Sequence, residues 1–531
     1  MVSRWKLIYP LHSETQLDLA DGIQRLSILP EHPSFPTTAA QIDRLPPETL
    51  AAIFVHLSKE ERDSHGRNSS SLIQDLVSIT HVCRFWRQVA INAPDLWNKI
   101  NTTNLEAVDT FLERSGAVPL SVDLRPLDRE ILLAVTPHVH RFRQFSLSAP
   151  RDPDYNPFVT LTKPAPLLER LGINYPAVDF GPYVLFDDQV PRLRELEMFT
   201  NGVWLQNQLG NLTSLDLTLR DTVSPRSNFP AFLDMLCRCP VLEEMVLWWN
   251  IWDVAPAEPN RSPTVPLHRL RKLLLRSFST GNIKYLLRSL AFMTNEVAIH
   301  LNAVNLETEG EDFVSELQTV FPNNNTHQPS LLSSTKLELI FHTQPRTVIL
   351  HAIGPRFAIR MDTCLDEYGR FDKVNFTFHD VFPSVKEFWV RGSTRLDARL
   401  NGFEHLPALE KLVINGRGSG LVRNIRRELS SDHPGILPCP LLSAIDCYGN
   451  ALEVDEIFLL MSTRSSAGHR LDNLRVPSSF IPLPVDISAF VRDFGSLDTP
   501  LKALHMHSME LPEFCFAKGH RWWKLWKSRL R

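Results

Sequence analysis

Apolar residues near the start of the chain recur with the period of an α-helix. The proline pair Pro46–Pro47 favours a first helical turn, because proline presets φ and that turn leaves its amide hydrogens unused. The apolar positions that follow are spaced i, i+3, i+4 and i+7, which predicts one stripe on a helix. The members of this stripe are Leu50, Ile53, Phe54 and Leu57.

A second stripe with the same period predicts a second helix, which ends at Asn92-Ala93-Pro94. Two short helices with this much apolar surface hide it poorly by themselves, so we expect part of it to meet a partner. The members of the second stripe are Leu72, Leu76, Ile79, Cys83, Trp86 and Ala90, with Leu96 and Trp97 directly after the stop.

The ordered motifs of this stretch resemble an F-box. They are Leu45-Pro46-Pro47-Glu48, the pair Ile53–Phe54, Val82-Cys83-Arg84-x-Trp86-Arg87 and Pro94-x-Leu96-Trp97. The resemblance implies binding to the Skp-family linker protein of cullin-RING ubiquitin ligases, while the rest of the chain selects a protein substrate. One departure is Ser58–Ser71, a longer inter-helix segment whose charged, Ser/Gly-rich composition predicts a solvated loop. The competing interpretation is an ordinary helical hairpin buried in its own protein.

The resemblance also implies which residues dock the linker protein, partly as that interface and partly as the core of the hairpin. They are Leu45, Pro46, Ile53, Phe54, Leu57, Cys83, Trp86 and Trp97.

Beyond Trp97 the pattern becomes apolar-x-x-apolar-x-apolar, with copies roughly twenty to thirty residues apart, as in leucine-rich repeats. The last two apolar positions alternate on a short strand and face the core, while the first fills the corner before it. Such strands must stack to bury their faces, which predicts an irregular solenoid with a parallel sheet on one side. An ordinary α/β sheet with Leu-rich strands is the alternative. The copies begin at Phe142, Leu168, Leu193, Leu212, Leu242, Leu270, Val385, Leu409, Leu442, Leu471 and Leu501.

Helical-looking segments between copies, such as Ala231–Leu236 and Ile283–Arg288, are expected to cover the convex side. The rhythm breaks between Val297 and His379, where short spacings predict a β-meander or repeats stripped of their helices. The expected strands there are Leu337–Phe341, Thr347–His351, Phe357–Met361 and Val374–Phe378.

The predicted fold class is therefore α/β, or α+β when the whole chain is counted: a short helical F-box followed by the irregular solenoid. In the tail, Trp522, Trp523 and Trp526 stand among basic residues; we favour a cap on the solenoid's open end over a membrane or nucleic-acid contact. The expected parts are a partly disordered leader (1–40), the F-box (41–100), the repeat domain (101–510) with its strand-rich insertion (297–380), and the basic Trp-rich tail (511–531).

Bulk properties narrow the function classes. The 531 residues are 43% hydrophobic and 22% charged, and a formal charge of −4 gives no general attraction to nucleic acid or anionic membranes. Seven scattered cysteines fit a reducing compartment. Without a membrane-length apolar run or a signal-peptide core, we expect the cytoplasm or nucleus, and neither membrane nor nucleic acid as partner.

Candidate catalytic motifs are weak. Cys237-x-Cys239 lacks a second ligand pair at zinc spacing, and Gly416-x-Gly418-x-Gly420 lacks the lysine of a phosphate-binding loop. No Gly-x-Ser-x-Gly elbow occurs. We therefore expect no cofactor, no metal and no catalysis by this chain, which leaves a ligase adaptor or a leucine-rich interaction scaffold.

The outward positions of the expected strands predict a substrate surface on the concave face. They begin acidic and then turn aromatic and basic, and Trp, Tyr and Arg dominate binding energy in protein interfaces. A register slip of one residue would turn them all inward. We predict a patch that favours aromatic or acidic partner groups, formed by Trp248, Arg276, Trp389, Arg391 and Tyr448.

Overall fold

The computed structural model describes most of the chain. The expected leader, most of the loop predicted after Ser58, the repeat copy at Leu501 and the tail tryptophans lie outside the described residues. The described ranges are 45–60, 70–148, 155–174, 184–200, 205–219, 225–249, 265–292, 296–304, 313–321, 330–343, 346–364, 373–392, 397–416, 419–430, 437–448, 454–477, 487–497 and 511–515.

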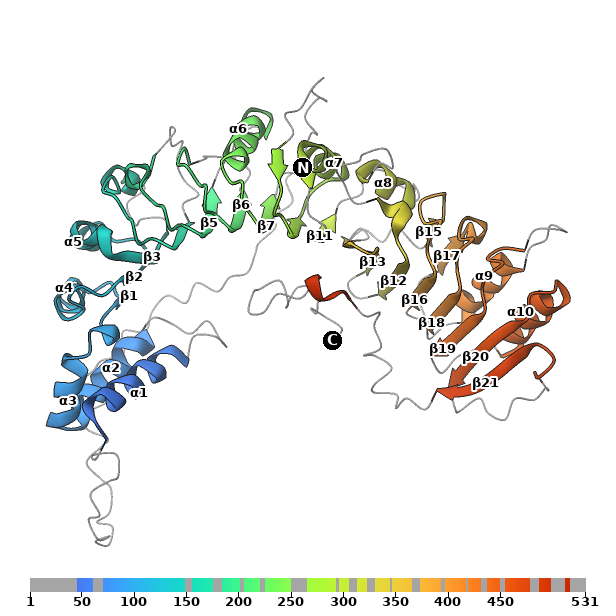
Figure 1. Cartoon of the computed structure of the whole chain (residues 1–531), viewed down its shortest axis with the longest axis horizontal. Helices are drawn as coiled ribbons and strands as arrows, with labels where there is room; N and C mark the ends of the chain where they lie inside the picture. Colours follow the sequence, from blue (N-terminus) through green and yellow to red (C-terminus); the bar gives the residue numbers. More distant parts are fainter. Residues whose placement is uncertain are drawn as a thin grey trace, which may run out of the picture.

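A unit of three short helices forms one end of the molecule (Figure 1). The prediction of a single second helix was wrong, because the backbone is extended at Cys83 (φ −155°, ψ 172°). There the Cys83 sulfur accepts the N–H of Trp86 at 3.4 Å and caps the start of a new helix. The elements are α1 (Pro47–Glu60), α2 (Ser70–Val82), α3 (Arg84–Ile91) and the 3₁₀ turn η3 (Pro94–Leu96).

Trp97 joins the helical unit to the rest of the molecule. Its indole N–H donates to the carbonyl of Ala90 at 2.8 Å, and its ring meets Phe111 edge-on at 5.3 Å between centroids. The guanidinium of Arg114 lies 4.4 Å from the centre of the same ring. Phe111 and Arg114 belong to α4 (Leu105–Arg114), so one buried side chain fixes this helix to α3.

A mostly parallel sheet of 17 strands runs through the remainder of the chain. Neighbours follow chain order from β1 to β7, then β9 and β11, then β14, β13 and β12, and finally β16 and β18 to β21. Figure 1 shows that these strands line the inner side of an arc. They are β1 (Lys99–Ile100), β2 (Leu120–Leu124), β3 (Phe142–Ser148), β4 (Arg170–Asn174), β5 (Glu195–Thr200), β6 (Ser214–Leu219), β7 (Glu244–Trp249), β9 (Lys272–Arg276), β11 (Val297–Val304), β12 (Lys336–Thr343), β13 (Arg346–Ile353), β14 (Phe357–Cys364), β16 (Glu387–Gly392), β18 (Lys411–Gly416), β19 (Ala444–Tyr448), β20 (Leu471–Pro477) and β21 (Val491–Leu497).

The strand predicted by each copy of the apolar pattern from Phe142 to Leu471 is present. The pairing aligns equivalent positions: Phe145 lies opposite Leu171, which in turn lies opposite Leu196, and all are buried. The chain is thus mixed α/β, with a short helical region followed by a large, mostly parallel sheet. Its assignment to leucine-rich repeats stays a prediction at this point.

Helices lie on the outer, convex side of the arc (Figure 1). The helices that follow α4 are α5 (Arg129–Val135), α6 (Pro225–Cys237), α7 (Thr280–Ser289), α8 (Phe313–Val320), α9 (Ser419–Leu429) and α10 (Val454–Ser466). The 3₁₀ turns are η4 (Thr136–Arg141), η5 (Pro157–Thr160), η6 (Phe186–Asp188), η7 (Leu331–Ser333), η8 (Phe403–His405) and η10 (Glu513–Cys515). Apolar side chains from helices and strands form one continuous core between the two layers. No helix in the described part of the chain has both the length and the apolar character needed to cross a membrane.

The middle of the sheet contains the predicted meander. β13 is antiparallel to both β12 and β14, which confirms three of the expected strands. The fourth, expected at Val374–Phe378, lies elsewhere: β15 (Lys373–Thr377) pairs in parallel with β17 (Asp397–Asn401) in a separate two-stranded sheet. A second small sheet joins β8 (Val265–Leu267) to β10 (Leu290–Phe292).

Candidate protein-docking surfaces

The helical unit carries a concentration of exposed apolar side chains. Among the described residues, five of the twelve large hydrophobic side chains that are exposed belong to α1, α2 and α3. Leu57 is 54% and Val82 59% exposed. Exposed apolar side chains concentrated on a small unit are typical of a protein-interaction surface. The five residues are Ile53, Leu57, Val77, Val82 and Phe85.

The structure divides the residues predicted to dock the linker protein into surface and core. Phe54 and Trp97 are buried, and Trp86 is half-buried with its ring 5.0 Å from that of Phe54. The remaining members stay accessible, with Leu45 half-buried and the others exposed: Pro46, Ile53, Leu57 and Cys83.

The residues predicted to bind the linker protein did not include three exposed apolar residues, Val77, Val82 and Phe85, although Val82 belongs to one of the quoted motifs. Each lies off the apolar stripe that predicted the second helix. An apolar residue on the expected polar face of an amphipathic helix has no partner within its own unit, and that was the available signal.

The sheet alternates as predicted on its concave face. Leu247 and Val390 are buried in the core, whereas Trp248, which follows Leu247 on β7, points the other way and is 39% exposed. Arg276, paired with Trp248 across β7 and β9, places its guanidinium 4.0 Å from the centre of the indole. These two residues form an accessible cation–π pair on the concave face.

The other predicted patch residues lie apart from this pair. Trp389 is half-buried and donates from its indole nitrogen to Glu387 at 2.9 Å. Arg391 and Tyr448 are only 6% and 7% exposed. Five strand steps separate β9 from β16, or about 24 Å at roughly 4.8 Å per step. The expected single exposed patch is therefore corrected to one open pair and a second, largely covered group.

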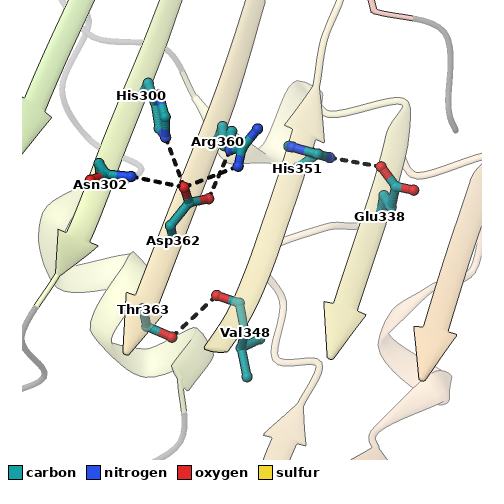
Figure 2. A network of polar contacts seen from close by, with 8 residues as sticks. All are labelled: His300, Asn302, Glu338, Val348, His351, Arg360, Asp362 and Thr363. Atoms are coloured by element: carbon teal, nitrogen blue, oxygen red, sulfur yellow. Dashed lines mark hydrogen bonds and ion pairs between the residues drawn. The ribbon is translucent and has the colours of Figure 1, made fainter. Parts of the chain in front are cut away.

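Between these groups lies a buried polar network on the concave side of β11, β13 and β14 (Figure 2). Asp362 is its centre: Arg360 donates to both carboxylate oxygens at 2.8 and 3.1 Å. His300 Nε2 lies 3.0 Å and Asn302 Nδ2 3.0 Å from the Asp362 Oδ2 atom. Three side chains from two strands thus surround the carboxylate of Asp362.

A second buried carboxylate, Glu338 of β12, continues this network. His351 Nδ1 lies 2.7 Å from one of its oxygens, as Figure 2 shows, and Arg391 Nε lies 3.0 Å from the other. Glu338 is 1% exposed, so its contacts with His351 and Arg391 are shielded from water. The network therefore ties β13 and β16 to β12 through side chains as well as through the backbone.

Burial and pairing act in opposite directions on the pKa values of this network. Burial alone would raise the pKa of Glu338, but the hydrogen bond from His351 and the charge of Arg391 outweigh it and lower that pKa. The pKa of Asp362 is likewise held well below its usual range, because His300 and Arg360 outweigh burial. Burial lowers the pKa of His300, against the opposing effect of Asp362. Both carboxylates are therefore ionised at neutral pH, and His300 is neutral.

The polar side chains of this network bind one another. Its acids already hold basic partners, and within the described residues no group of three or more His, Cys, Asp or Glu is placed to hold a metal ion. Sequence reasoning selected only Arg391 from it. The available signal was the alternation of charged residues with apolar ones on β11, β12, β13 and β14.

Comparison with known protein families found a match for the helical unit. Residues 42–103 match the family model described as F-box-like, a range that contains α1 to α3 and the Trp97 joint. The chain thus carries an F-box-like domain, followed by the sheet. No curated protein showed significant similarity to the chain.

Proposed function

We propose that this chain is a substrate adaptor of a Skp–cullin–F-box ubiquitin ligase, in which the helical unit binds a Skp-family linker protein. F-box domains generally bind such linkers. The observation that carries the proposal is the cluster of exposed apolar side chains on a unit that matches the F-box-like family. The adaptor would work by proximity, holding a substrate near a ubiquitin-charged enzyme recruited by other subunits.

We further propose that the sheet is an irregular leucine-rich-repeat solenoid with substrate on its concave face. The recurring apolar pattern supports this, because its copies fall on parallel strands in matching register. The convex position of the helices supports it as well (Figure 1).

Co-purification with a Skp-family linker protein tests the adaptor proposal. We expect wild-type chain to co-purify when the two are co-expressed, and Leu45→Ala/Pro46→Ala to weaken the complex. Ile53→Asp/Leu57→Asp should lower the affinity at least about 100-fold, since each half-exposed side chain contributes roughly 1 kcal/mol and each buried carboxylate adds a desolvation cost.

A matched control uses exposed apolar residues of the sheet-bearing part. Leu441→Asp/Leu459→Asp changes the same chemistry at similar exposure and should leave the linker complex intact. A folded wild-type chain that does not co-purify ends the adaptor proposal, and so does an Ile53→Asp/Leu57→Asp variant that binds like wild type.

The alternative is a leucine-rich interaction scaffold without a role in ubiquitin transfer. Both functions use the same concave surface, and substrate delivery leaves no motif on an adaptor. Ubiquitination of a captured partner in a reconstituted ligase separates them. An adaptor supports transfer that depends on the helical unit, whereas a scaffold binds the same partner without transfer.

A further inference from the structure

A short segment near the end of the chain lies on the concave face. Residues Leu511 to Cys515, which include η10, contact β11 in the middle of the arc (Figure 1). Cys515 is only 1% exposed, and burial raises the pKa of its thiol to about 12, so it stays protonated and apolar. This segment therefore covers the sheet rather than extending away from it.

The segment covers a small apolar island in an otherwise polar face, which we call the apolar seat. Cys515 is buried together with Leu274, Ala298, Ile353 and Ala358, and Leu511 packs at the edge of the same cluster. The seat, defined by its sheet residues, consists of Val246, Leu274, Ala298, Ile353, Ala358 and Trp389.

The strand register explains the shape of the seat. Ala298, Ala358 and Ile353 stand side by side in one cross-strand row, which ends at Lys272 on one side and Lys336 on the other. Two alanines leave room for a chain to approach the sheet closely. The flanking lysines are each paired with a glutamate, Lys272 with Glu244 at 2.5 Å and Lys336 with Glu387 at 3.4 Å, so apolar contact rather than charge selects the occupant.

The seat borders the polar network, which fixes its position. His300 follows Ala298 by two residues on β11, and Arg360 follows Ala358 by two on β14. Because these neighbours are buried and paired with Asp362, the strands beneath the seat are held in register. The seat is thus preorganised for an apolar occupant.

In the described part of this segment, two side chains contact the seat. Among the side chains that the structure describes, these two are Leu511 and Cys515, spaced i, i+4, while Glu513 between them is exposed. A contact of this size is weak between separate molecules and persists because the segment belongs to the same chain. A substrate with more contacts can therefore displace it.

We propose that the apolar seat is the substrate-docking site, that it accepts a protein segment that forms a short helical turn with a Leu followed four residues later by a small apolar residue, and that Leu511–Cys515 is a built-in competitor for it. This inference rests on the proposed function, in which the concave face binds substrate. Trp248 and Arg276 lie on the neighbouring strands and would contact the same substrate beyond the seat.

Binding of a labelled peptide tests the inference on the full-length chain. The probe is a fluorescein-labelled synthetic peptide with the sequence of residues 507–518, followed by fluorescence anisotropy. In the Leu511→Asp/Cys515→Asp variant the seat is vacated, and we expect it to bind the peptide at least tenfold more tightly than wild type does. Leu511→Ser, a milder variant, should give an intermediate affinity.

Two matched controls isolate the seat. A peptide with Asp at both the Leu511 and Cys515 positions should not bind the vacated variant, and Leu441→Asp, an exposed change elsewhere, should behave like wild type. Equal binding of both peptides, or equal binding by wild type and a vacated variant with native circular dichroism, overturns the inference. If Leu511→Asp/Cys515→Asp does not fold, Leu511→Ser decides by the same comparison. The linker co-purification experiment is independent, so a peptide that binds while the linker does not would reject the adaptor function and retain the seat.

Discussion

The helical unit and the concave face of the sheet differ in whether their apolar and charged side chains are left exposed or are covered and paired. The helical unit leaves Leu57 and Val82 more than half exposed, whereas the central concave face pairs its charges and covers its apolar seat. An uncovered apolar surface gains free energy with any complementary apolar partner, while paired charges gain little until a partner replaces each pair. The first surface therefore suits a constant partner, and the second suits a selective one.

The largest expected effect comes from removing one partner of a buried ion pair on the concave face. Glu338→Leu leaves the buried Arg391 guanidinium without its carboxylate, and should lower the free energy of unfolding by about 3–5 kcal/mol. Glu338→Leu/Arg391→Met removes both charges and should recover a large part of that loss. Urea denaturation of the three proteins measures it; a double variant less stable than Glu338→Leu would contradict the pairing account.

A second pair of variants separates core from surface within the helical unit. Phe54→Ala removes a buried ring that contacts Trp86, and should cost about 3 kcal/mol and disorder the unit. Leu57→Ala, one turn later, should change stability by less than about 0.5 kcal/mol yet weaken linker binding about tenfold. Thermal unfolding together with a linker titration distinguishes these outcomes, and similar stability losses for both variants would reject the division.

Acid should destabilise the fold through the network around His300. The folded-state pKa of His300 lies below 6.5, so its contribution is complete above pH 6.5 and is lost as the pH falls, when the unfolded chain takes up the proton first. Since the limiting slope is about 1.4 kcal/mol per pH unit, the loss from His300 between pH 6.5 and 5.5 should be at most about 1 kcal/mol. Asp362 and Glu338, whose pKa values are also lowered, add losses in the same direction at lower pH.

Denaturation at several pH values measures this slope. His300→Asn removes the titrating group and should flatten the curve between pH 6.5 and 5.5, while His268→Asn, at an exposed position, serves as the control. An unchanged slope in His300→Asn would show that other groups cause the acid sensitivity.

The smallest expected effect concerns the open pair on the concave face. A double-mutant cycle of Trp248→Ala and Arg276→Ala should give a coupling energy of about 0.5–1 kcal/mol, the usual value for an accessible cation–π contact. Denaturation of the four proteins supplies the cycle. A coupling near zero would mean that the stacked geometry adds nothing to stability and that Trp248 is held only by the sheet.

The local pattern of apolar residues predicted the strands and helices, whereas tertiary contacts determined which of their outward side chains are buried. The period of two placed Trp248 outward and Leu247 inward, because each strand needs only its own sequence to set that alternation. The break at Cys83 was missed, since this residue also fits the apolar stripe that continues through it.

Burial on the concave face depended on residues distant in sequence. Arg391 is buried and paired with Glu338 of β12, and Trp389 is half-buried because it packs against the other residues of the seat, which Cys515 covers. The local pattern of apolar and polar residues predicts neither of these contacts. The accessible half of the predicted substrate patch could thus be found from sequence, whereas the covered half required the three-dimensional arrangement.

The order of strands in the sheet sets the distance of each strand from the helical unit. From β1, next to the Trp97 joint, eight strand steps lead to β11, or about 38 Å along the arc at roughly 4.8 Å per step. A ligand bound one strand further on would be displaced by one such step relative to the joint. Because Trp97 is locked between α3 and α4, that spacing is transmitted to the helical unit instead of being averaged by a flexible hinge. Inserting or deleting one strand unit would therefore change the distance between a ligand on the concave face and the helical unit by a fixed amount.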